Sequence, residues 1–159
     1  MTKKELVKFL VANFKDEFGY VDLSGLNFKD EEIEAVDIRG MKVNGDLYQS
    51  EQKVKGDLWQ QEQEVNGYLY QYKQQVEGSL HQEEQTVKIC LYQEKQNVLG
   101  NLLQEQQTVR GSLHQYKQQV EGNLYQEDQR VEGDLCQDCQ EVNGNLYQGR
   151  HKVKGDLCN

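Results

Sequence analysis

Residues 120–141 read VEGNLYQEDQR followed by VEGDLCQDCQE, and the two halves are copies of one 11-residue unit. Valine recurs every eleven residues from Val43 to Val153, which makes eleven tandem copies. Each valine is followed after four positions by leucine, and after two by glycine, except where Ile89 replaces it. Glutamines follow after six and nine positions, and His151 ends the second series. The unit V-x-G-x-L-x-Q-x-x-Q-x has the fixed period of a repeat architecture.

Two architectures fit this period. A long helix would complete three turns in eleven residues, and abundant Glu, Gln and Lys suit a helix. Against it, a glycine in nearly every copy costs about 1 kcal/mol each relative to alanine. Alternatively, Q-x-V-x-G-x-L-x-Q gives nine alternating positions and then a two-residue corner, which is the pattern of a strand with one face turned inward. We therefore predict a mainly β protein, a parallel β-solenoid.

The length of one coil is a separate question. Stacked copies would place valine on valine, leucine on leucine and glutamine on glutamine, with rungs about 4.8 Å apart and hydrogen bonds between the stacked amides. A coil of 11 residues leaves hardly any room for leucine inside. We therefore favour 22 residues, in a flattened or four-sided coil with two strands facing each other across a Val/Leu core, and about five coils. In that case Cys136 and Cys158 lie on adjacent rungs, whereas an 11-residue coil places Tyr147 between them.

The chain divides into three predicted parts. Residues 1–20 are expected to form an amphipathic helix that caps the solenoid, or else docks a partner. Residues 21–40 form a transition, and residues 41–159 form the solenoid. We expect the last coil to be covered by a second copy of the chain, which would give a homodimer through Leu146, Val153 and Leu157.

The overall charge limits the partners. A formal net charge of −9 and a pI near 4.9 argue against direct binding of nucleic acid. No apolar run approaches the roughly 18 residues that would span a membrane, and no secretory signal is present. We therefore expect a cytoplasmic protein, in the host bacterium if a phage encodes it.

The two corner positions of the unit carry much of the acid. Stacked along a rod, these side chains would form one or two anionic ridges that imitate the phosphate track of nucleic acid. The alternative is a solvated face that only keeps the protein soluble, and Lys73, Lys95 and Lys117 interrupt the series. The predicted ridge residues are Glu51, Glu62, Glu83, Glu84, Glu94, Glu105, Glu127, Asp128 and Asp138.

The position after each repeat leucine is mostly aromatic. By alternation these side chains face outward, where aromatic residues are good contacts for a protein partner. Alternatively, the rings simply stabilise neighbouring rungs by stacking. The predicted aromatic column consists of Tyr48, Trp59, Tyr70, Tyr92, Tyr125 and Tyr147, with His81 and His114 at equivalent positions.

Motifs for catalysis or for cofactors are not apparent. Cys136-x-x-Cys139 lacks the second ligand pair of a zinc site and the βαβ context of a redox motif, so we interpret these residues as ordinary thiols. The three histidines have no partner nucleophile, and the glycines follow the repeat rather than a phosphate. We expect no enzyme activity, no metal and no cofactor.

Two short stretches show a resemblance to a known family. Val21-Asp22-Leu23-Ser24-Gly25-Leu26-Asn27-Phe28 and the half-unit Gly45-Asp46-Leu47-Tyr48-Gln49 resemble the pentapeptide-repeat proteins. The resemblance implies a four-sided right-handed β-helix, dimers through the C-terminal coils, and mimicry of DNA toward enzymes such as type II topoisomerases. Here, however, the period is 11, and the second half-unit centres on glutamine and valine.

These patterns lead to two functional hypotheses. The first is an acidic, non-enzymatic binding protein that inhibits a DNA- or RNA-handling enzyme, as a phage or mobile-element inhibitor of host defence would. The second is a structural or self-assembling repeat scaffold.

Overall fold

The computed structural model describes residues 20–22, 24 and 35–158. Within these residues the chain forms short strands joined by turns and bends, with no helix. The helix expected over residues 1–20 and most of the transition over residues 21–40 lie outside the described residues.

The strands form four parallel sheets. Sheet A contains β1 (Tyr20–Asp22), β4 (Asp46–Tyr48), β8 (Leu69–Tyr72), β12 (Leu91–Glu94), β16 (Leu113–Tyr116), β20 (Leu135–Asp138) and β24 (Leu157–Cys158). Sheet B contains β5 (Lys53–Val54), β9 (Gln75–Val76), β13 (Asn97–Val98), β17 (Gln119–Val120) and β21 (Glu141–Val142). Sheet C contains β2 (Ala35–Asp37), β6 (Asp57–Trp59), β10 (Leu80–His81), β14 (Leu102–Leu103), β18 (Leu124–Glu127) and β22 (Leu146–Gly149). Sheet D contains β3 (Lys42–Val43), β7 (Glu64–Val65), β11 (Thr86–Val87), β15 (Thr108–Val109), β19 (Arg130–Val131) and β23 (Lys152–Val153).

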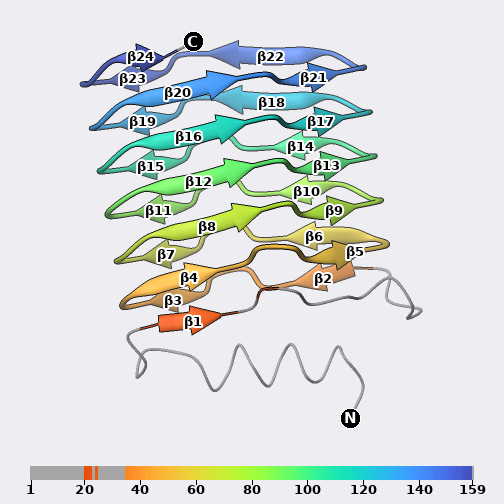
Figure 1. Ribbon diagram of the computed structural model, residues 1–159, viewed down its shortest axis with the longest axis horizontal. Coiled ribbons are helices and arrows are strands. Elements are labelled where there is room, and N and C mark those ends of the chain that lie inside the picture. Colours follow the sequence, from red (N-terminus) through yellow and green to blue (C-terminus); the bar gives the residue numbers. More distant parts are fainter. Residues whose placement is uncertain (1–19, 23, 25–34, 159) are drawn as a thin grey trace.

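The register of the sheets shows how far the chain travels in one coil. Leu47 pairs with Leu69, and Leu69 pairs with Leu91, so successive rungs are 22 residues apart. Within one coil the chain passes through sheets D, A, B and C in that order, and the coils stack along one axis (Figure 1). The predicted parallel β-solenoid is confirmed. Cys136 pairs with Cys158, the outcome expected of a 22-residue coil.

The prediction of one nine-residue strand per copy is wrong. The chain also bends at Asn44 and Gly45, between β3 and β4, so each copy supplies two short strands and each coil has four sides. Glycine occupies this second bend because the backbones of successive coils approach closely there and leave no room for a Cβ. A Cβ built on Gly67 would lie 2.7 Å from the carbonyl carbon of Gly45, and the Gly67 amide donates to the Gly45 carbonyl at 2.9 Å.

The residue after the glycine also links successive coils. The Oδ1 atom of Asp46 accepts a hydrogen bond from the backbone N–H of Tyr68 at 2.8 Å, and Asn101 accepts one from Asn123 at 2.9 Å. Asp, Asn and Ser at this position therefore satisfy a backbone donor that the bend leaves out of the sheet.

A large share of the interior is polar. Valines and leucines fill one part of each coil, and sixteen glutamines fill the rest at 0–1% exposure. The Gln71 amide nitrogen donates to Gln49 Oε1 at 3.0 Å, and that of Gln74 donates to the Gln49 backbone carbonyl at 2.9 Å. Because a carbonyl only accepts, the second contact fixes the orientation of the amide. The predicted glutamine stacking is thus present as buried ladders, in which the amides from Gln63 to Gln129 donate toward the preceding coil.

The second corner of each copy has a left-handed backbone. Ten non-glycine residues there have φ between 52° and 58°, among them Gln106 at 55°. We expect Gln106→Gly to raise the free energy of unfolding by about 0.5–1 kcal/mol, because side chains disfavour this conformation. Gln75→Gly, in strand β9, is the matched control and should lower it by about 0.5–1 kcal/mol. Urea unfolding checks both, and a destabilised Gln106→Gly would contradict the expectation.

Candidate functional site

The left-handed corners line up as two separate edges of the rod. Corners that follow sheet A lie on one edge, and those that follow sheet C lie on the other, because one coil holds two copies. Ridge residues predicted from the sequence are therefore divided between two edges.

Six of the nine predicted residues lie together after sheet C. We call this row the acidic edge, and it consists of Glu62, Glu83, Glu84, Glu105, Glu127 and Asp128. The backbone of the edge is tied from coil to coil, for example from the Glu84 amide to the Glu105 carbonyl at 3.0 Å. Neutral Gln106 is the only interruption of the row between Glu83 and Asp128.

The carboxylates of the acidic edge disfavour the charged form of Glu105, which lies at the centre of the edge. The pKa of Glu105 is raised, first by partial burial and then by the charges of Glu127, Glu83 and Asp128. The folded state therefore holds this proton more tightly than the unfolded chain does, so stability falls as the pH rises through the raised pKa.

We expect Glu105→Gln to raise the melting temperature at pH 7 by about 1–2 °C. The reason is that the substitution removes a charge that the fold disfavours. Well below the ordinary pKa of glutamate both proteins should melt alike, because the carboxyl is then protonated in either state. Thermal melts of both proteins between about pH 3 and 8, a range that contains the ordinary titration of glutamate, measure this difference in melting temperature. Glu94→Gln is the matched control and should not stabilise, since Glu94 lies on the other edge.

The other edge is mixed. Lys73, Lys95 and Lys117 occupy its outermost corner positions, and we call it the lysine edge. It also carries the remaining predicted ridge residues, Glu51, Glu94 and Asp138. Lys73 forms an exposed ion pair with Glu51 at 3.0 Å.

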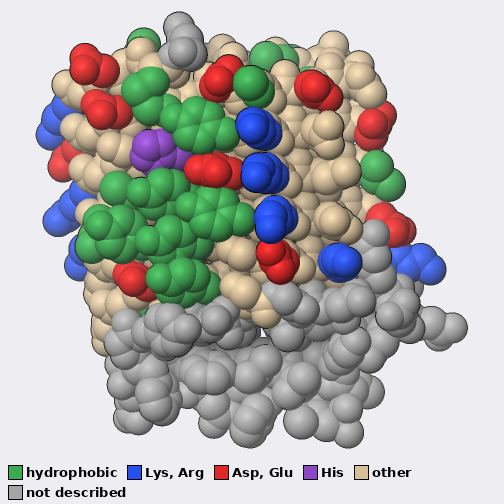
Figure 2. Space-filling view, viewed as in Figure 1, with side chains coloured by type: hydrophobic (Ala, Val, Ile, Leu, Met, Phe, Trp, Pro, Cys, Tyr) green, Lys and Arg blue, Asp and Glu red, His purple; other side chains and the backbone are tan. Residues whose placement is uncertain are grey.

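Beside the lysine edge, sheet A carries most of the tyrosines. Figure 2 shows this face as a cluster of hydrophobic side chains next to a column of cationic ones. Ring centroids are 4.6 Å apart for Tyr48 and Tyr70, 5.2 Å for Tyr70 and Tyr92, and 4.8 Å for Tyr92 and His114. Burial, followed by the neighbouring Tyr48, raises the pKa of Tyr70 to about 12, so its hydroxyl stays protonated at neutral pH. This surface, the tyrosine face, consists of Tyr48, Tyr68, Tyr70, Tyr72, Tyr92, His114 and Tyr116.

The aromatic column predicted from the sequence is therefore two columns. Tyr48, Tyr70 and Tyr92 lie on sheet A, whereas Trp59, Tyr125 and Tyr147 lie on sheet C. On sheet C, Trp59 stacks on His81 at 3.9 Å and Tyr125 stacks on Tyr147 at 4.8 Å. We call this the second aromatic face, with His81 and Leu103 as its other members. Since rings within each column stack on one another, most present their edges rather than their faces to a partner.

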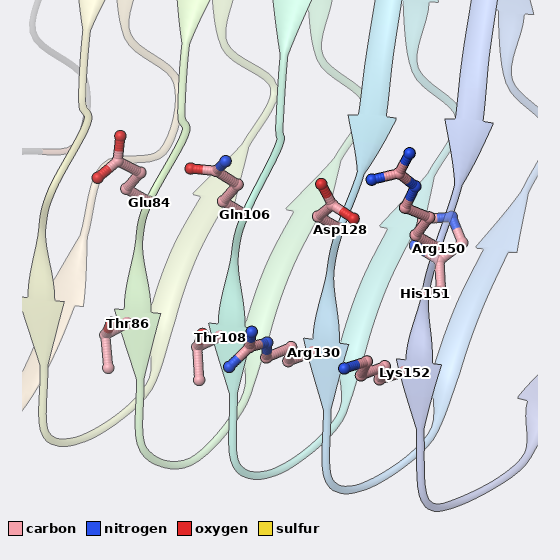
Figure 3. A pocket seen from close by; sticks show the side chains of 9 residues that line it. All are labelled: Glu84, Thr86, Gln106, Thr108, Asp128, Arg130, Arg150, His151 and Lys152. Carbon is pink, nitrogen blue, oxygen red and sulfur yellow. The ribbon is translucent and has the colours of Figure 1, made fainter.

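A groove of about 790 Å³ runs beside the acidic edge (Figure 3). Glu84, Gln106 and Asp128 form one side, and Thr86 and Thr108 of sheet D form the other. Toward the last coil the lining becomes cationic, with Arg130, Arg150 and Lys152, and His151 lies among them. Burial lowers the pKa of His151, against the opposing effects of Asp128 and Glu127. The acidic edge thus ends where the cations begin.

The last described coil exposes residues that are buried elsewhere. Leu146 is 47% exposed and Leu157 is 67% exposed, whereas the equivalent Leu124 and Leu135 are 0% and 2% exposed. Val153 is partly buried against the core. A disulfide joins Cys136 to Cys158 on the next rung of sheet A, so the interpretation of Cys136 as an ordinary thiol is wrong, while Cys139 is a free, exposed thiol.

The described residues contain no group of three or more His, Cys, Asp or Glu side chains that would hold a metal. No helix in this part of the chain is long and apolar enough to cross a membrane.

Comparison of the chain with protein-family models, with curated proteins and with solved structures finds no match. The functional proposal therefore rests on the arrangement of the side chains.

The sequence does contain a signal for the two edges, at the left-handed corner position. Over the six central copies this position reads Lys73, Glu84, Lys95, Gln106, Lys117 and Asp128, whereas Glu51 and Glu62 before them and Cys139 and Arg150 after them do not follow the alternation. The alternation of lysine with acidic or amide residues has a period of 22, which matches one coil and separates the edges.

Proposed function

We propose that the protein is a non-enzymatic binding protein whose acidic edge occupies the basic groove of a DNA- or RNA-handling enzyme and blocks it. The observation that carries the proposal is the gathering of six acidic side chains on one edge of the rod, while Lys73, Lys95 and Lys117 lie on the other.

The density of charge on this edge supports mimicry of nucleic acid. Successive rungs are about 4.8 Å apart, so six carboxylates over four rungs give about one charge per 3 Å. One strand of duplex DNA carries a charge about every 3.4 Å along the axis. A groove that binds a phosphate backbone therefore meets a similar linear charge on this edge.

Rigidity supports the same function. Backbone hydrogen bonds tie each acidic corner to the next, from Glu62 to Glu83 at 3.1 Å and from Gln106 to Glu127 at 3.0 Å. A preorganised row of charges loses little conformational freedom on binding and steers a basic partner toward it.

The biological setting is part of the proposal. An inhibitor of this kind acts in the bacterial cytoplasm, where a phage or mobile element would use it against a host-defence nuclease, including CRISPR effectors. The acidic composition of the chain and the absence of catalytic motifs in its sequence support a blocking role.

The test compares two triple charge reversals in capture from bacterial lysate. Glu84→Lys, Glu105→Lys and Asp128→Lys alter the acidic edge, whereas Glu51→Lys, Glu94→Lys and Asp138→Lys alter the lysine edge. Each set raises the formal net charge by six, from −9 to −3, so the sets differ in position and not in total charge.

We expect the wild-type protein to retain a nucleic-acid-handling enzyme that short duplex DNA displaces. The acidic-edge variant should lose this enzyme, and the variant reversed at Glu51, Glu94 and Asp138 should keep it. Equal behaviour of the two variants, or capture that DNA does not displace, would show that the acidic edge does not imitate nucleic acid.

A homodimer through the last coil is a second proposal, supported by the exposure of Leu146 and Leu157. Burial of these leucines by another copy is hydrophobic, so the dimer should persist at high salt. Leu157→Glu should then give a monomer in sedimentation velocity, and a wild-type monomer at all concentrations would exclude this dimer.

A further inference from the structure

The tyrosine face and the second aromatic face are built alike but are flanked by opposite charges. Three residues after Tyr70 comes Lys73 of the lysine edge, and three residues after His81 comes Glu84 of the acidic edge. We propose that the tyrosine face of one molecule docks onto the second aromatic face of another copy, with the lysine edge against the acidic edge and the solenoid axes antiparallel.

Spacing identifies the occupant as a second copy. Lys73, Lys95 and Lys117 recur once per 22-residue coil, along a straight line with rungs about 4.8 Å apart. A partner that faces all three lysines needs carboxylates in a straight row at the same spacing. The acidic edge meets this requirement because the same coil sets its spacing.

Charge in the central coils is complementary. The three corners of the lysine edge from Tyr72 to Lys117 hold three lysines and one acid, Glu94. The three corners of the acidic edge from Glu83 to Asp128 hold five acids and no cation.

Strand direction sets the relative orientation of the two copies. The strands of sheets A and C point in opposite directions around the coil (Figure 1). If two parallel copies met face to face, the lysine edge would lie on one margin of the contact and the acidic edge on the other. With antiparallel axes both edges fall on the same margin, and Lys73, Lys95 and Lys117 meet Asp128, Glu105 and Glu84 in that order.

The centre of the contact is aromatic. Stacked tyrosines present ring edges and hydroxyls as an even strip, and Trp59, Leu103 and Tyr125 form the opposing column. Tyrosine and tryptophan contribute strongly to protein interfaces because they combine large apolar area with few rotatable bonds.

The assembly is open-ended. Each molecule uses sheet A on one side and sheet C on the other, so the contact is heterologous and continues to a third copy rather than closing as a dimer. Because exposed ion pairs contribute little individually and salt screens them, association should be strong only at low ionic strength.

The experiment uses sedimentation velocity of the full chain over a range of concentrations, at about 10 mM and about 500 mM salt. Wild-type protein should grow beyond a dimer at low salt and lose this association at high salt. The lysine-edge variant, which combines Lys73→Glu, Lys95→Glu and Lys117→Glu, should associate at least about tenfold more weakly.

A matched control keeps the same net charge. Lys42→Glu, Lys53→Glu and Lys152→Glu also lower it from −9 to −15, but these lysines lie on sheets B and D and not on the two docking faces, so this variant should associate more than the lysine-edge variant. The acidic-edge variant used above should not self-associate, and a mixture of it with the lysine-edge variant should associate again. Circular dichroism of each variant verifies that it is folded.

Three results would overturn the proposal: wild-type protein that does not grow beyond a dimer at low salt, equal association of the lysine-edge and control variants, or a mixture that stays dissociated. The lysine-edge variant leaves the acidic edge intact, so self-association can fail while capture of a target persists. A dimer that survives at high salt would instead indicate the contact through Leu146 and Leu157 of the last coil.

Discussion

Replacing Gln82 with leucine is expected to lower the free energy of unfolding by about 3–5 kcal/mol, although leucine is the more apolar residue. The Gln82 side-chain nitrogen donates to Gln60 at 3.0 Å and to Gln74 at 3.1 Å. Its oxygen accepts hydrogen bonds from the amides of Gln93, Gln96 and Gln104. Leucine would remove these five buried hydrogen bonds, each of which contributes about 0.5–1.5 kcal/mol net. Each partner keeps at least one other hydrogen bond, for example from Gln71 to Gln60 and from Gln96 to Gln74.

Urea unfolding of Gln82→Leu provides the measurement. Gln119→Leu is the matched control, because Gln119 is exposed on strand β17 and its substitution should change stability by no more than about 0.5 kcal/mol. If Gln82→Leu were as stable as the wild type, the glutamine ladders would fill space without contributing hydrogen bonds.

The second large effect is expected at a glycine corner. Gly100→Ala should destabilise the protein by about 2–3 kcal/mol, and Gly100→Val by more. A Cβ at this position would lie 2.6 Å from the carbonyl oxygen of Gly78 and 2.8 Å from the Ser79 hydroxyl. Relief requires the coils to separate, which weakens the hydrogen bond of 3.0 Å from Gly100 to Gly78.

Ile89 provides an internal control, since it occupies the glycine position in its own copy. Its amide lies 3.3 Å from the Gly67 carbonyl, the longest of the equivalent bonds, and its side chain is 39% exposed. We expect Ile89→Gly to be tolerated within about 0.5 kcal/mol, because it restores the ordinary corner. A loss as large as that of Gly100→Ala would mean that Ile89 packs favourably and that steric crowding does not explain the glycines.

Sequence reasoning reached the fold because the interior of a solenoid repeats side-chain types strictly. Alternation around Val, Leu and Gln identified strands, and identical residues at equal spacing identified parallel stacking with amide ladders. The second bend was missed because glycine fits a strand and a corner equally well in an alternating pattern. Only the closeness of Gly67 to Gly45, which depends on the neighbouring coil, distinguishes the two.

The surface residues were harder to place. Glu94 and Glu105 occupy the same position of the unit, yet they lie on different edges because adjacent copies face different sides of the coil. Tyr48 and Trp59 were separated in the same way. The sequence prediction treated every copy as equivalent and therefore placed the two residues of each pair on one surface. The alternating charge at the left-handed corner would have shown that adjacent copies face different sides.

The two-copy coil has a consequence for how such a gene tolerates change in length. Loss or gain of 22 residues removes or adds one whole coil, and every downstream side chain keeps its side of the rod. Loss of 11 residues preserves the stacked interior but turns the downstream part by half a coil. Its lysines would then continue the row of carboxylates, and its carboxylates the row of lysines. Loss or gain of one or of two repeat units should therefore leave the stacked interior able to fold. Only an even number of units preserves the charge pattern that a partner meets.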